Sequence, residues 1–108
     1  MTIASPYSFF PGQAVRMTFT VKDMTVTGYP NGVLTDPTAI VFRLHSPAAA
    51  SPDVFNYPGA AQVTRLSVGV FALDVVPGTD GVWRYSATAS GNVSAVDQGT
   101  FTVMPTNV

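Results

Sequence analysis

A strict alternation of apolar and polar residues is the feature that most constrains how this chain can fold. Between Ala14 and Lys22 every second residue is apolar: Val15, Met17, Phe19 and Val21. Successive side chains of a β-strand point to opposite faces, so this pattern predicts a half-buried strand. The same residues do not fit the 3.6-residue period of an amphipathic helix.

The same period of two returns along the rest of the chain. It predicts further strands over residues 38–45, 69–76, 82–89 and 95–104, with these residues pointing inward: Ile40, Phe42, Leu44, Phe71, Leu73, Val75, Trp83, Tyr85, Ala87, Phe101 and Val103. Shorter strands are expected at 62–66 and at 54–57, the latter an edge strand or loop because Pro58-Gly59 follows it.

These segments predict an all-β protein, a single immunoglobulin-like antiparallel β-sandwich of about seven strands. Turn signals such as Pro77-Gly78 and Gly91-Asn92 separate them, and no segment has the length and pattern of a stable helix. We expect an N-terminal arm over residues 1–11, the sandwich over 12–104 and a C-terminal tail over 105–108. Between Asp23 and Asp36, the Asn31-Gly32 pair predicts a small protruding hairpin or a long loop.

Composition excludes several classes of function. A formal net charge of −1 supplies no field to attract nucleic acid or an anionic membrane surface, so neither is expected as a partner. The chain has no cysteine, hence no disulfide and no thiolate nucleophile. Its first residues lack the basic and apolar regions of a signal peptide, and no apolar run approaches the roughly 18 residues of a membrane span.

Catalytic and metal-binding patterns are missing as well. His45 is the single histidine, and no cysteine or glutamate accompanies it as a ligand or orienting group. The six aspartates are isolated, mostly in turns, and show neither the spacing of a calcium loop nor that of a catalytic triad. We therefore expect no enzyme, no cofactor and no metal site.

Six aromatic residues fall outside the core alternation: Tyr7, Phe9, Phe10, Tyr29, Phe55 and Tyr57. They are interpreted as lids over the ends of the sandwich, as anchors of a protein interface or as a sugar-stacking platform. Charged residues make up 10% of the chain, against about 25% in a typical soluble domain. Such a surface suits a subunit that packs against neighbours.

Several segments carry a family resemblance: Thr35-Asp36-Pro37-Thr38, the run from Val63 to Val75, Gly81-Val82-Trp83-Arg84-Tyr85, and Gln98-Gly99-Thr100-Phe101-Thr102-Val103. Over residues 12–104 the chain resembles the small immunoglobulin-like proteins encoded among the virion structural genes of tailed bacteriophages. That family is not enzymatic, so no catalytic residue carries over.

The resemblance implies a virion structural protein, made in the host cytoplasm, and a capsid decoration (cement) subunit is the first expectation. A neck, tail or fibre-attachment protein and a glycan-binding adhesive module are the alternatives. The implied partners are other virion proteins, namely the major capsid or neck and tail proteins, and copies of the chain itself. The arm and the loop over Met24 to Val33 would make these contacts, with Tyr7, Phe9, Phe10 and Tyr29 as the anchors.

Overall fold

The computed structural model describes residues 2–3 and 8–105, and in that part of the chain every regular element is a strand. The strands are β1 (Thr2–Ile3), β2 (Ser8–Phe9), β3 (Val15–Thr20), β4 (Lys22–Asp23), β5 (Val33–Leu34), β6 (Ala39–His45), β7 (Asp53–Tyr57), β8 (Val63–Ser67), β9 (Val70–Val75), β10 (Gly81–Ser90) and β11 (Ala95–Val103). Among these residues no helix is long and apolar enough to cross a membrane.

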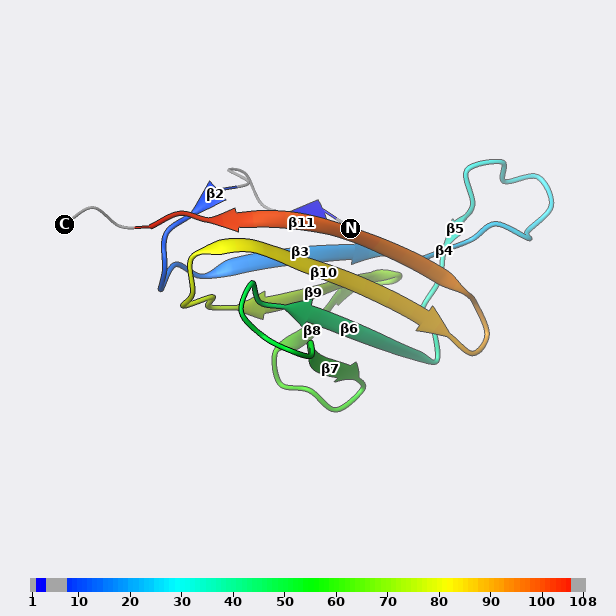
Figure 1. Ribbon diagram of the computed structural model, residues 1–108. Helices are drawn as coiled ribbons and strands as arrows, with labels where there is room; N and C mark the ends of the chain where they lie inside the picture. The colour runs from blue at the N-terminus through cyan, green and yellow to red at the C-terminus, as the bar shows by residue number, and fades with distance from the viewer. Residues whose placement is uncertain (1, 4–7, 106–108) are drawn as a thin grey trace.

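Two larger sheets hold most of the strands (Figure 1). One has the order β1-β3-β9-β8 and the other the order β2-β11-β10-β6-β7, while β4 and β5 form a two-stranded ladder. All pairs are antiparallel except β2 with β11, which is parallel. The predicted all-β class with antiparallel sheets is therefore confirmed.

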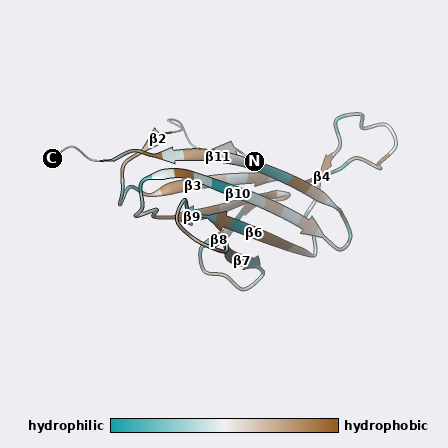
Figure 2. Ribbon diagram, in the orientation of Figure 1, coloured by the Kyte–Doolittle hydropathy of each residue, from teal (hydrophilic) through white to brown (hydrophobic). Residues whose placement is uncertain are grey.

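The inward-facing residues of both sheets form one hydrophobic core. The alternation predicted it closely, since the buried side chains include Val15, Met17, Phe19, Val21, Ile40, Phe42, Leu44, Phe71, Leu73, Trp83, Tyr85, Ala87, Phe101 and Val103. Val75 is only partly buried against this core. Figure 2 shows hydrophobic and hydrophilic residues following one another along β10 and β11, as a half-buried strand requires.

Aromatic contacts join the two sheets. Phe19 of β3 meets Phe42 of β6 edge to face with ring centroids 6.1 Å apart, and Tyr57 of β7 meets Phe71 of β9 at 4.9 Å. Within the larger sheet, Trp83 stacks on Phe101 at 5.9 Å, and its indole N–H donates to the carbonyl oxygen of Thr79. The buried tryptophan thereby satisfies its one polar atom.

The N-terminal segment expected as a separate arm is paired with both sheets where the structure describes it. Thr2 and Ile3 pair with β3, and Ser8 and Phe9 pair with β11, so the described residues of the segment belong to both sheets. Two-residue strands carry no readable alternation, which is why the sequence did not predict them. Of the expected tail, Pro105 is irregular and residues 106–108 lie outside the described residues.

The segment between Asp23 and Asp36 combines both forms expected for it. β4 and β5 pair over two residues, Lys22 with Leu34 and Asp23 with Val33, and residues 24–32 then extend as a loop. Figure 1 shows this loop projecting from one end of the sheets, while β2 and the end of β11 lie at the opposite end. We call residues 24–32 the projecting loop.

Replacement of Phe19 by alanine is expected to lower the free energy of unfolding by about 3–5 kcal/mol, because it removes a buried ring and leaves a cavity between the sheets. Urea denaturation measures the change. Thr20→Ala, at the exposed neighbouring position of the same strand, is the control and should change stability by no more than about 0.5 kcal/mol. Equal losses for both variants would contradict the contact assigned to Phe19.

Candidate functional site

The four residues expected as interface anchors are not brought together. Phe10 and Tyr29 are exposed, with 53% and 57% of their surface accessible. Phe10 directly follows β2 and Tyr29 lies in the projecting loop, so they occupy opposite ends of the protein (Figure 1). Tyr7 lies outside the described residues.

Phe9 corrects the expectation made for it, because it is a core residue. Only 4% of its surface is accessible, and its ring meets Phe101 edge to face at 5.8 Å. Its carbonyl oxygen accepts a hydrogen bond of 2.6 Å from the Met104 amide. Adjacent side chains of a strand point to opposite faces, so burying Phe9 leaves Phe10 in solvent. Because Phe9 and Phe10 are both aromatic, the sequence pattern could not show which of the two side chains faces inward.

The projecting loop has local order that keeps apolar side chains in solvent. The Asp23 carboxylate accepts hydrogen bonds from the Thr25 amide (2.9 Å) and hydroxyl (2.6 Å), as Asx turns do. These bonds, the hydroxyl's first, hold the pKa of Asp23 below its usual value. Farther along, the Gly32 amide donates to the Tyr29 carbonyl at 3.0 Å. The large exposed apolar side chains of the loop are Met24, Val26 and Tyr29.

Asp36 ties the base of this loop to the sheets. Its carboxylate accepts hydrogen bonds from the Arg65 guanidinium (3.0 Å) and from the Gly69 amide (2.8 Å), and its carbonyl accepts from the Asn92 side chain (3.0 Å). The arginine hydrogen bond, followed by the Gly69 amide, lowers the pKa of Asp36. Gly69 has a φ of +70°, and a Cβ there would lie 2.7 Å from the Val21 carbonyl oxygen. A side chain at Gly69 would therefore break this connection.

The opposite end of the molecule carries a hollow of about 430 Å³ between the two sheets. Its walls are mainly apolar and come from Leu44, Phe55, Val75, Val76, Pro77 and Trp83, with Ala14, Gln62, Asp53 and Asp74 completing the lining. Phe10 lies in the neighbouring turn, since the Gln13 amide donates to the Phe10 carbonyl and the Gly12 amide donates to the Pro77 carbonyl. We call this region the apolar hollow.

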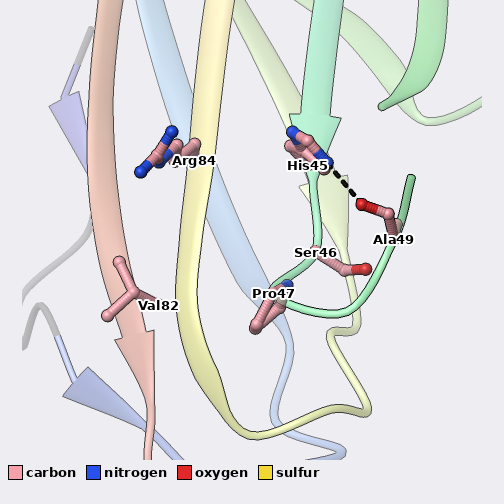
Figure 3. Close-up of a pocket in the computed structure, with 6 residues that line it drawn as sticks. All are labelled: His45, Ser46, Pro47, Ala49, Val82 and Arg84. Carbon is pink, nitrogen blue, oxygen red and sulfur yellow. Dashed lines mark hydrogen bonds between the residues drawn. The ribbon is translucent and has the colours of Figure 1, made fainter. Parts of the chain in front are cut away.

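A third surface lies on the outer face of the five-stranded sheet. Arg84 of β10 is paired in register with His45 of β6, and Arg43 is paired with Ser86. Arg84 and His45 line a hollow of about 330 Å³ (Figure 3), in which the Arg84 guanidinium extends away from His45. Neither Arg43 nor Arg84 has an ion pair among the described residues, whereas Arg16 contacts Asp74 at 2.7 Å. The face therefore offers hydrogen-bond donors to acidic groups.

This arginine face was not found from the sequence. The alternation did place Arg43 and Arg84 outward, each on its own strand, but it could not show that β6 and β10 are neighbours. A turn signal indicates pairing only for consecutive strands, and β6 and β10 are separated in the chain by three other strands. His45 donates from Nε2 to the Ala49 carbonyl oxygen at 2.7 Å, so this nitrogen is occupied by the backbone.

The described residues do not form the arrangement that a metal site or a sugar-binding platform requires. No three histidine or aspartate residues gather there in a way that could hold a metal ion. A sugar platform requires exposed aromatics aligned on one face, but Phe55 and Tyr57 pack partly buried against the core. Phe10, directly after β2, and Tyr29, between β4 and β5, belong to opposite ends of the protein and cannot stack on one sugar (Figure 1).

Comparison with known proteins does not assign the chain to a family. No protein-family model matches the chain, and a search of curated proteins finds no significant match.

Phe9→Ala is expected to cost about 3 kcal/mol of stability, because Phe9 fills the core beside Phe101. Phe10→Ala is the matched control and should stay within about 0.5 kcal/mol, since its ring is exposed. Chemical denaturation of both variants measures the difference. A destabilisation by Phe10→Ala as large as that by Phe9→Ala would contradict the assignment of one ring to the core and the other to the surface.

Asp36 gives the stability a defined dependence on pH. Because its pKa is lowered in the folded state, its contribution is fully present above the ordinary aspartate pKa of about 4 and is lost as the pH falls through the folded pKa. Thermal unfolding should show Asp36→Asn with a lower Tm than the parent at pH 7. This difference should shrink as the pH falls from about 5 to about 2.

The control for this pH series is Asp80→Asn, because Asp80 is an exposed aspartate outside the two ion pairs of the described residues. Its Tm should follow that of the parent at every pH. A difference between parent and Asp36→Asn that persists unchanged at low pH would show that the carboxylate charge is not what holds the loop base.

Proposed function

We propose that the protein is a non-enzymatic structural component of a bacteriophage virion, in first place a capsid decoration subunit, that acts through protein–protein contacts. The observation that carries this proposal is the projecting loop, which keeps Met24, Val26 and Tyr29 in solvent on a locally ordered backbone. Exposed apolar side chains gathered at one place mark interaction sites in soluble proteins. Aromatic and methionine side chains are also enriched at interfaces.

We also propose that the fold is an immunoglobulin-like β-sandwich. In such folds one sheet has the strand order A-B-E-D and the other contains C, F and G. The order β1-β3-β9-β8 corresponds to the first sheet, and β11-β10-β6 corresponds to G-F-C of the second, with β7 in the place of an additional C′ strand. The ring pairs Phe19–Phe42 and Tyr57–Phe71, which join one sheet to the other, take the place of the inter-sheet disulfide of antibody domains.

The proposed partners are shell or neck and tail proteins of the same particle, and copies of the chain itself. The scarcity of charge supports this setting, because 10% charged residues leave much of the surface uncharged and able to pack against a neighbour. The arginine face would meet acidic groups of such a partner. Localisation in the virion follows from this proposal.

Mass spectrometry of size-fractionated native particles tests the proposal. We expect the chain in the fraction that contains the shell protein, at a fixed molar ratio to it that survives repeated purification. A ratio near that of the shell subunits supports decoration, and a much smaller ratio supports a neck or tail position. Recovery only in the fraction of free soluble protein would overturn the proposal.

A further inference from the structure

The projecting loop and the apolar hollow lie at opposite ends of the protein. Figure 1 shows the loop beyond β4 and β5 at one end. The hollow is lined by Ala14 just before β3, by Val75 at the end of β9 and by Trp83 near the start of β10, all of which lie at the other end. The loop therefore cannot reach the hollow of its own copy, and it projects outward from the sheets.

The two features match in chemistry. The loop presents a methionine, a valine and a tyrosine, while the walls of the hollow come from Leu44, Phe55, Val75, Val76, Pro77 and Trp83. A volume of about 430 Å³ is within the range of about 300–1,000 Å³ seen for sites that hold small ligands, and it can accept the Tyr29 ring. Tyrosine suits this place because its ring is apolar and its hydroxyl can stay in water.

The charges at the two ends are also complementary. Lys22, exposed at the base of the loop, has no ion pair among the described residues. Asp53, exposed at the rim of the hollow, likewise has no carboxylate contact to a described lysine or arginine. The other carboxylate in the lining, Asp74, is already paired with Arg16 at 2.7 Å. At these two ends, Lys22 and Asp53 are thus side chains of opposite charge without an ion pair among the described residues, and they can pair between copies.

We propose that copies of this chain associate head to tail, with the projecting loop of one copy seated in the apolar hollow of the next. Such a heterologous contact uses two different surfaces, so each bound copy leaves one loop and one hollow open. Addition continues until the rotation between successive copies closes a ring, or it continues as a filament. Phe10 and Tyr29, which the fold separates, then belong to the two sides of one interface.

The inference takes its biological setting from the proposed function, but it is tested on the purified chain alone. Analytical ultracentrifugation of the parent protein should show concentration-dependent species heavier than the monomer. The loop variant Met24→Ser/Tyr29→Ser and the hollow variant Asp53→Lys/Val76→Lys change only exposed residues and should each sediment as monomers. Melting curves confirm that both variants are folded.

Mixing the two variants gives the decisive result. The loop variant keeps an intact hollow and the hollow variant keeps an intact loop, so an equimolar mixture should form 1:1 dimers and nothing larger. Val96→Ser, at the most exposed large apolar residue of β11 and outside both surfaces, is the control and should associate as the parent does. The double charge exchange Lys22→Asp/Asp53→Lys should associate more strongly than either single exchange.

A parent protein that stays monomeric up to about 1 mM, a concentration that corresponds to only about 4 kcal/mol of binding, would overturn the inference. So would association retained by either variant alone, or a mixture that stays monomeric. The proposed function has its own readout in the particle fractions. A monomeric chain recovered from particles would refute the head-to-tail contact only, and an associating chain missing from particles would refute the virion proposal only.

Discussion

The edge-to-face contact between Phe19 and Phe42 is the interaction on which the arrangement of the two sheets depends. It joins the C-terminal part of β3 to the middle of β6, and hence one sheet to the other, without any covalent link. The two strands reach this contact because each presents a continuous row of buried apolar residues. The alignment of the two sheets determines the position of the surfaces at both of their ends. These surfaces include the hollow between β7 and β9.

Polar interactions contribute less than aromatic packing to holding the two sheets together. Within the described residues the two arginine–aspartate pairs have partly exposed side chains, and exposed pairs contribute little to stability on average. Asp36 is important for a different reason, because it binds Arg65, Gly69 and Asn92 from three separate turns or strands. It fixes where the chain leaves the sheets to form the projecting loop. Hydrophobic burial thus holds the two sheets together, and a few hydrogen bonds fix the points where loops leave the sheets.

The longer strands and the inward faces could be predicted from the sequence because a period of two over six or more residues has one physical interpretation. The pairing of β2 with β11 could not, since two residues have no period and their partner is more than ninety positions away in the chain. The apolar hollow could not be predicted from the sequence either. Its lining comes from segments that meet only through the strand order. The exposure of Tyr29 could be predicted from its place in a loop, because that prediction needs no knowledge of strand pairing.

The way in which the projecting loop is attached affects how the sequence of this protein can vary in evolution. Residues 24–32 contribute no side chain to the buried core, and their two-residue ladder and the Asp36 contacts lie outside the loop itself. The loop can therefore vary in length and composition at little cost to folding, as connections held at a fixed base generally do. The surface at this end and the stability of the sheets are therefore encoded in separate stretches of the chain, so the loop can be exchanged without rebuilding the sheets that hold it.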